Sequence, residues 1–167
     1  MRIVIAGDHA SPALKRTLAE HLRARGHEVR DLGTDDETSV DYPDYAAAAC
    51  REVLAGRAER AVLICGTGIG IGIAANKIPG IRCAIAHSPE TGRLAWEHNQ
   101  AQALALGARV LDPETAKATV DAWLAARADE GERHRQRLAK IAALEQRPCS
   151  TASSPSSELP SPSTPPS

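Results

Sequence analysis

The stretch AVLICGTGIGIG, residues 61–72, decides the fold of this chain. Its first five residues are continuously apolar, which is typical of a strand buried on both faces of a sheet. Glycines at alternate positions from 66 to 72 end that strand, and a short helix reaching about Asn76 is expected to follow. A buried strand that passes through a glycine-rich turn into a helix predicts a βα unit.

The same alternation extends in both directions along the chain. Four further short apolar segments predict strands, over residues 2–6, 27–32, 81–86 and 103–106. Helices are predicted between them and after them, over residues 11–26, 43–55, 88–98, 112–127 and 132–145. Ser11 is expected to be the N-cap of the first helix, with a proline in its first turn.

This order of elements predicts an α/β protein with a doubly wound, Rossmann-like, three-layer sandwich. Its five-stranded parallel sheet would be joined by right-handed crossovers and followed by a C-terminal helix. Ligands of such folds bind beyond the carboxyl ends of the strands. The fold alone does not define a function.

Composition limits the class of protein. The chain has 167 residues and a formal charge of −1, from 20 Lys and Arg against 21 Asp and Glu, so no attraction to nucleic acid or anionic membrane is expected. No apolar run approaches the roughly 20 residues of a membrane span, and residues 1–7 are too short for a signal peptide. Four scattered cysteines without a CxxC pair argue against a zinc site or a disulfide framework. We expect a cytoplasmic protein that needs no metal.

The composition changes at Pro148. From there to Ser167, 14 of 20 residues are Pro or Ser. Such a segment buries too little apolar surface to offset its ordering entropy, so we predict one domain over residues 1–147 and a disordered tail over 148–167. PxxP-like spacing leaves a recognition role open, although an inert extension is favoured.

The glycine-rich turn predicts an anion site. Alternating glycines allow several backbone N–H groups to face one concavity. The turn lacks the GK[ST] of a P-loop, and neither Gly66 nor Gly68 begins a GxGxxG pattern, so a nucleotide fingerprint is excluded. Cys65 lies at the mouth of this turn. It could be a small buried hydrophobe, or a thiolate stabilised by local amides that acts as nucleophile or general base.

Two further pairs of polar residues are candidates for the site. Asp8 and His9 follow the first strand, where they could cap a turn or bind sugar hydroxyls. His98 and Asn99 end the fourth helix, where the histidine could complement the helix dipole or donate a proton.

Arginines add a preference for phosphate. Arg133 and Arg137 are spaced i, i+4 and could grip one phosphate, although a solvated face is the commoner explanation. Arg109 follows the fifth strand. Three arginines together with a glycine-rich turn indicate a phosphorylated small molecule.

With these residues in view, the chain resembles the type B ribose-5-phosphate isomerase family, which includes galactose-6-phosphate isomerase subunits. The resemblance covers residues 2–147. The matching pieces are Gly7-Asp8-His9, Asp41-Tyr42-Pro43, Cys65-Gly66-Thr67-Gly68-Ile69-Gly70, Ala74-Ala75-Asn76-Lys77, Pro79-Gly80-Ile81-Arg82, His98-Asn99, Gly107-Ala108-Arg109-Val110 and Arg133-His134-x-x-Arg137.

The resemblance implies an aldose–ketose isomerase of the pentose phosphate pathway. It would interconvert ribose 5-phosphate and ribulose 5-phosphate through a cis-enediolate, without a cofactor. Ile71 stands where one subtype carries a glutamate base, so the resemblance assigns the base to Cys65. It further implies that His98 is the ring-opening acid and that Thr67 moves protons between the sugar oxygens. The implied substrate-binding residues are Asp8, His9, Gly66, Gly68, Ile69, Gly70, Asn99, Arg109, Arg133, His134 and Arg137.

The family also implies a homodimer, or a tetramer, in which the last helix extends over the neighbouring site and brings Arg133 and Arg137 to it. Two alternatives stay open. The substrate could be another phosphosugar such as allose 6-phosphate, or the protein could be a non-catalytic sugar-phosphate sensor. A dehydrogenase is disfavoured, because the turn at Gly7 has no dinucleotide fingerprint.

Overall fold

The computed structural model describes residues 1–145, and these form a five-stranded sheet with six helices. The strands are β1 (Arg2–Gly7), β2 (Glu28–Asp31), β3 (Arg60–Cys65), β4 (Cys83–Ile85) and β5 (Ala103–Gly107). The helices are α1 (Pro12–Ala24), α2 (Tyr42–Leu54), α3 (Ile69–Ala75), α4 (Pro89–Glu97), α5 (Pro113–Ala125) and α6 (Glu132–Glu145). Every predicted element is present, and β4 is shorter than expected. The tail predicted from Pro148 lies outside the described residues.

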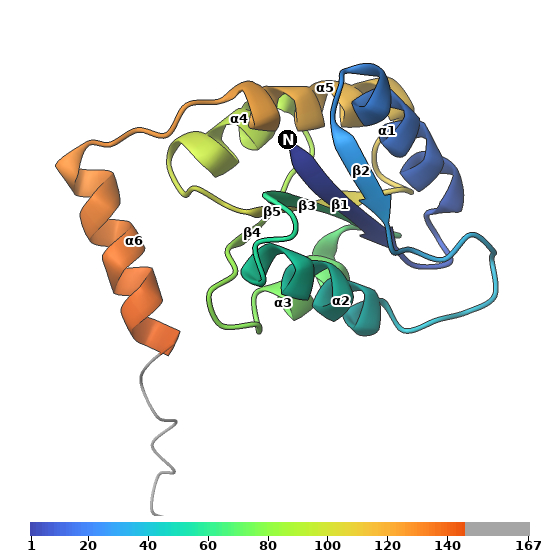
Figure 1. The fold of residues 1–167 in the computed structure, drawn as a ribbon, viewed down its shortest axis with the longest axis horizontal. Coiled ribbons are helices and arrows are strands. Elements are labelled where there is room, and N and C mark those ends of the chain that lie inside the picture. Colours follow the sequence, from blue (N-terminus) through green and yellow to red (C-terminus); the bar gives the residue numbers. More distant parts are fainter. Residues whose placement is uncertain (146–167) are drawn as a thin grey trace, which may run out of the picture.

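The sheet is entirely parallel, with strand order β2-β1-β3-β5-β4. Helices α1, α4 and α5 cover one face, and α2 and α3 cover the other (Figure 1). The predicted doubly wound sandwich is therefore confirmed. Helix α6 stands apart from these layers at the end of an extended connection (Figure 1), and His134 is its one buried residue.

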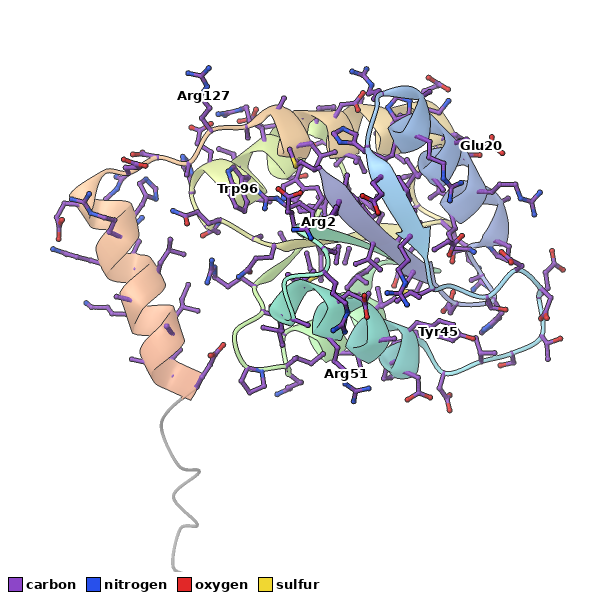
Figure 2. The ribbon with its side chains drawn as sticks, viewed as in Figure 1. Arg2, Glu20, Tyr45, Arg51, Trp96 and Arg127 are labelled. Atoms are coloured by element: carbon purple, nitrogen blue, oxygen red, sulfur yellow. The ribbon has the colours of Figure 1, made fainter. Side chains whose placement is uncertain are left out.

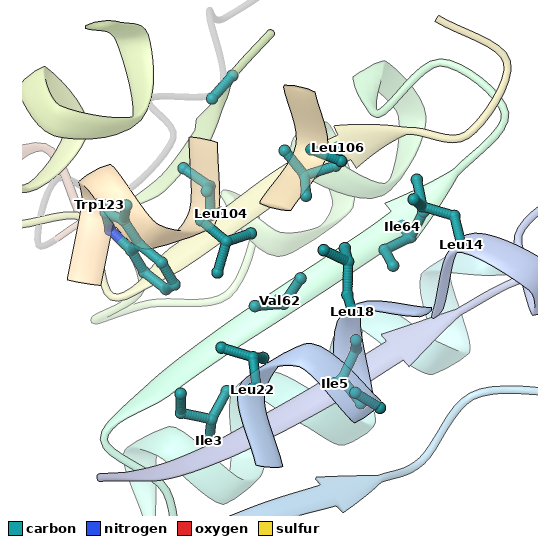
Figure 3. Packing of buried hydrophobic residues seen from close by; sticks show 14 of the residues in the cluster. Ile3, Ile5, Leu14, Leu18, Leu22, Val62, Ile64, Leu104, Leu106 and Trp123 are labelled. Atoms are coloured by element: carbon teal, nitrogen blue, oxygen red, sulfur yellow. The ribbon is translucent and has the colours of Figure 1, made fainter. Parts of the chain in front are cut away.

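Two hydrophobic clusters hold the layers together. One joins the sheet to α1, α4 and α5 through side chains such as Leu18, Val62 and Trp123 (Figure 3). The other lies under α2 and α3 and is built mainly of alanines and small aliphatic residues. Since β1, β3 and β5 are apolar on both faces, these three strands form the centre of the molecule.

The helix starts differ in how they are capped. Ser88 forms a capping box with Thr91 at the start of α4, and Asp112 accepts two backbone N–H groups at the start of α5. Ser11 occupies the predicted N-cap position of α1, but its side chain makes no capping hydrogen bond. Its hydroxyl instead donates to the carbonyl of Asp8 at 2.8 Å, with that of Ile64 at 3.3 Å as a second acceptor. It ties α1 to the ends of β1 and β3.

The two tryptophans of the chain both lie near the guanidinium of Arg60. Trp123 is fully buried and its indole N–H donates to the carbonyl of Ala101 at 3.0 Å. Trp96 lies on α4 (Figure 2). The guanidinium of Arg60, at the start of β3, lies 3.3 Å from the centroid of the Trp96 ring, which is a cation–π contact. None of the helices formed by residues 1–145 is long and apolar enough to cross a membrane.

We predict that Trp123→Ala lowers the free energy of unfolding by about 3–5 kcal/mol, because it opens a large cavity in the α5 layer and leaves a carbonyl unpaired. Denaturant unfolding would measure the loss. Trp123→Phe, which keeps most of the ring volume, should lose less than half as much. A change below about 1 kcal/mol for the alanine variant would contradict this account of the core.

Candidate active site

The predicted functional residues after β1 and β3 meet at the switch point of the sheet. The chain passes from β1 to β2 on one side and then returns to β3 on the other. The carboxyl ends of β1 and β3 therefore border the crevice in which ligands of open α/β sheets bind. Asp8 and His9 follow β1, and Cys65 is the last residue of β3.

A cavity of about 460 Å³ lies at this place. It is lined by Asp8, His9, Ala10, Tyr42, Cys65, Gly66, Thr67, Ile69, Gly70 and Arg109. Eight of these ten residues were predicted from the sequence. Tyr42 was missed as a site residue, although it belongs to the Asp41-Tyr42-Pro43 motif, and its ring lies against Gly70.

The Cys65 thiol is held by the turn that follows it. Its side chain is 4% exposed and its sulfur accepts the backbone N–H of Gly68 at 3.2 Å. Gly68 has a φ of +79°, and a Cβ there would lie 2.9 Å from the carbonyl carbon of Leu106. Only glycine allows this backbone to pass so close to β5 while its amide points at the sulfur.

The amides of the turn differ in whether they already have a partner within it. The N–H of Gly68 binds Cys65, and the N–H of Ile69 binds the hydroxyl of Thr67 at 3.3 Å. Both amides are engaged by side chains of the turn itself. Among the predicted anion-binding amides, those of Gly66, Thr67 and Gly70 have no hydrogen-bond partner among the described residues.

His9 is fixed by a neighbouring loop. The backbone N–H of Val40 donates to His9 Nδ1 at 3.2 Å. Since Nδ1 accepts, the neutral ring carries its proton on Nε2 and can donate from there. Asp8 is buried and its carboxylate accepts the N–H of Ala10 at 3.0 Å.

Arg109 extends the site to β5. Its backbone N–H donates to the carbonyl of Gly66 at 2.9 Å, so sheet-like pairing continues past the end of β3. Its guanidinium lies over the same glycine, with Nη1 3.4 Å from where a Cβ would stand. Arg109 therefore places a positive charge beside the cavity.

A second group of predicted residues forms a separate cluster. The rings of His98 and His134 stack with centroids 4.5 Å apart. His134 Nε2 is 3.3 Å from Asp129 Oδ2 and 3.2 Å from Arg133 Nη2, and His98 Nε2 is 3.5 Å from Glu97 Oε1. The sequence reasoning missed both carboxylates. Arg137 is exposed on α6.

The two clusters lie at opposite ends of the strands. The cluster around Cys65 lies at their carboxyl ends, and the cluster around His98 lies at their amino ends. The carbonyl of Asn99 accepts from Arg82, directly before β4, and the starts of β3, β4 and β5 lie side by side. Cys65 is four residues along β3 from Ala61, which places it about 13 Å further along the sheet. Within one chain, His98 and Asn99 are therefore remote from Cys65.

The second cluster is the one described group with metal-ligand chemistry. Ligand atoms of His98, Asp129 and His134 lie within 4.8 Å of one another. The Arg133 guanidinium already supplies a positive charge there. The hydrogen bond from the Gly131 amide, together with electrostatic contributions from the basic side chains around it, holds the pKa of the Asp129 carboxyl below its usual range. We therefore interpret the cluster as an imidazole pair balanced by carboxylates, and the expectation of a metal-free protein stays a prediction.

A doubly wound sheet with a cysteine, a histidine and an arginine around its switch point defines an α/β protein built to bind a small anionic ligand. A family model described as Ribose/Galactose Isomerase matches residues 3–141. The chain belongs to this family.

Three relatives illustrate the similarity. The chain is 45% identical to ribose-5-phosphate isomerase B of Escherichia coli K12, over 87% of this chain and 97% of that protein. A solved structure of Clostridium thermocellum ribose-5-phosphate isomerase B matches with a TM-score of 0.85 and 46% identity, over 87% of this chain and 98% of that one. D-erythrulose-4-phosphate isomerase of Pectobacterium atrosepticum is 41% identical, over 78% of this chain and 87% of that protein.

We predict that iodoacetamide labels Cys65 at least tenfold faster than Cys50 or Cys83. Burial raises the pKa of the Cys50 thiol to about 11, and burial with the neighbouring Cys50 raises that of Cys83 to about 12, so both stay protonated. The Cys65 sulfur lines the cavity and receives an N–H. Peptide mapping by mass spectrometry would measure the rates, with Cys65→Ala as the control. Equal labelling of all three in the folded protein would contradict the prediction.

Proposed function

We propose that this protein is an aldose–ketose isomerase that interconverts D-ribose 5-phosphate and D-ribulose 5-phosphate through a cis-enediolate. The observation that carries the proposal is the Cys65 thiol, held by the Gly68 amide in a cavity with His9 and Arg109. Membership of the ribose/galactose isomerase family supports the reaction class.

In the proposed mechanism Cys65 is the base. As a thiolate it takes the proton from C2 of the aldose, is a neutral thiol while the enediolate exists, and becomes a thiolate again when it gives the proton to C1. The hydrogen bond from Gly68 stabilises the negative charge on sulfur before the first transfer and after the second. Ile71, which stands at the position of the alternative glutamate base, is fully buried in the core. The Thr67 hydroxyl moves protons between O1 and O2, and the amides of Gly66, Thr67 and Gly70 stabilise the enediolate.

The remaining residues bind the sugar and its phosphate. Asp8 and His9 hold sugar oxygens, with His9 donating from Nε2. Arg109 supplies charge on the Cys65 side. His98 is the acid that opens the furanose ring, Asn99 binds a sugar oxygen, and Arg133, Arg137 and His134 bind the phosphate.

The proposal requires a second copy of the chain. His98 and Asn99 stand at the opposite edge of the sheet from Cys65 in the same chain, as do Arg133 and His134 beside them. We propose a homodimer in which these residues complete the partner's site. Exposed apolar side chains at and near the cavity support contact with another chain, namely Tyr42, Ile69, Ile73 and Val110.

No cofactor is part of the proposal, because proton transfer through an enediolate involves no external electron acceptor. The proposal also includes a cytoplasmic location. A thiol base must stay reduced, and Cys50, Cys65 and Cys83 are free thiols in the part of the chain that the structure describes.

The deciding experiment follows ribose 5-phosphate by NMR in D2O, with purified protein and excess EDTA. We expect ribulose 5-phosphate to appear, with deuterium at the migrating position. Cys65→Ala should lower kcat by about 100-fold or more, while Cys50→Ala, which removes a buried thiol remote from the cavity, should retain kcat. Loss of activity with EDTA would contradict the metal-free mechanism.

Mixing two inactive variants tests the shared site. Cys65→Ala and Arg137→Ala chains, unfolded and refolded together, should regain roughly a quarter of wild-type activity, because random pairing leaves one intact site in half of the dimers. Each variant refolded alone is the control. Absence of recovery, with mixed dimers shown to form, would contradict residues acting across the interface.

Another phosphosugar is the second candidate substrate. The Pectobacterium atrosepticum relative is named for a four-carbon sugar phosphate. Allose 6-phosphate, the alternative raised by the sequence, has a longer carbon chain than ribose 5-phosphate. Comparing kcat/KM for these sugars with that for ribose 5-phosphate would rank them. Saturable binding of all of them without exchange of a proton would instead indicate a sensor.

A further inference from the structure

Lys15 of α1 is a charged side chain buried beside the candidate active site. Its side chain is 1% exposed, and its Nζ lies 2.7 Å from Asp31 Oδ2 and 2.7 Å from Asp35 Oδ1. Burial opposes its charge, but the hydrogen bonds to the two carboxylates outweigh this effect and raise the pKa of Lys15. Lys15 in turn lowers the pKa of Asp35. Both groups are therefore charged at neutral pH.

These ion pairs fasten the loop of residues 32–41 to the end of β1. Asp31 closes β2, and Asp35 lies within the loop. A Cβ at Gly33 would lie 2.5 Å from Lys15 Cδ and 2.6 Å from the amide nitrogen of Gly7, so the loop passes in direct contact with both. The N–H of Thr34 also donates to the carbonyl of Gly7 at 3.1 Å.

The same loop reaches the active site at its other end. Val40 donates its backbone N–H to His9 Nδ1 at 3.2 Å. Gly7, against which the loop is fastened, stands two residues before His9. The loop thus connects a buried ammonium group to the imidazole that faces the cavity, through the Asp35 carboxylate near one end and the Val40 amide near the other.

We propose that Lys15 and Asp35 are positioning residues, which hold the loop of residues 32–41 so that the Val40 amide fixes His9 as a donor from Nε2. A buried charge needs its partners in place, whereas an ordinary exposed pair contributes little. The ion pair with buried Lys15 therefore holds the Asp35 carboxylate against α1, although the Asp35 side chain is 87% exposed. The position of the loop depends on Asp35, and the tautomer of His9 depends on the position of the loop.

The expected change in KM rests on the proposed function, whereas the expected His9 tautomer does not. If His9 binds a sugar oxygen equally in the ground state and the transition state, loss of its fixed tautomer raises KM and leaves kcat nearly unchanged. The tautomer itself can be observed in the protein without any turnover.

Asp35→Ala is the test variant, because its exposed side chain can be removed without opening the core. Long-range 1H–15N NMR of the imidazole nitrogens should show one Nε2–H tautomer for His9 in the wild-type protein and averaged nitrogen shifts in the variant. The KM for ribose 5-phosphate should rise about fivefold with kcat within twofold. Asp35→Asn, whose amide oxygen can still accept from Lys15, should recover most of both effects.

Glu37→Ala is the matched control. Glu37 is an exposed acid of the same loop whose carboxylate makes no hydrogen bond to the described residues, and we expect its removal to change neither the His9 shifts nor KM. Unchanged His9 shifts in Asp35→Ala would overturn the proposal, and so would equal changes in both variants. An inactive wild-type protein with the expected NMR result would contradict the proposed function and leave this inference standing.

Discussion

The register of β3 between β1 and β5 is the constraint on which the candidate site depends. The ladder pairs Gly7 with Ile64, and Cys65 with Gly107. It then continues beyond the strands, where Asp8 donates to Ile64 and Arg109 donates to Gly66. Backbone hydrogen bonds thus fix the acid after β1, the thiol at the end of β3 and the cation after β5 relative to one another. A shift of one residue in this register would turn their side chains to the other face.

The strand register brings functional residues together, whereas the direction of the helices separates others from them. The functional residues are divided between the carboxyl ends and the amino ends of the strands. Each crossover helix runs back toward the start of the next strand, so residues at its end stand at the amino edge. His98 ends α4 beside the start of β4, whereas Cys65 ends β3 at the carboxyl edge. A single chain of this topology cannot bring the two together by a local rearrangement. The proposed homodimer, in which two chains share these residues, would bring them together without a change of fold.

Much of this could be predicted from the sequence, because apolar periodicity and turn residues determine which elements form and where they end. The strand AVLIC and the glycines after it indicated the place where the cavity lies. The patterns could not reveal the Gly68 amide directed at the Cys65 sulfur, nor the Ser11 hydroxyl bound to carbonyls, since such bonds depend on the three-dimensional path of a turn. His98 lies at the amino ends of the strands because α4 runs back along the sheet. The motif His98-Asn99 alone does not show this direction.

The two edges differ in construction in a way that suits the proposed chemistry. Around Cys65, backbone packs directly on backbone, since a Cβ at Gly107 would lie 2.7 Å from Thr67 and one at Gly68 would lie 2.9 Å from Leu106. Proton transfer requires a base held within a fraction of an ångström, and close-packed backbone provides that precision. The proposed phosphate grip is different. It relies on Arg133 and Arg137, whose long side chains extend from a helix with one buried residue, and a doubly charged phosphate tolerates a looser geometry because Coulomb attraction falls slowly with distance.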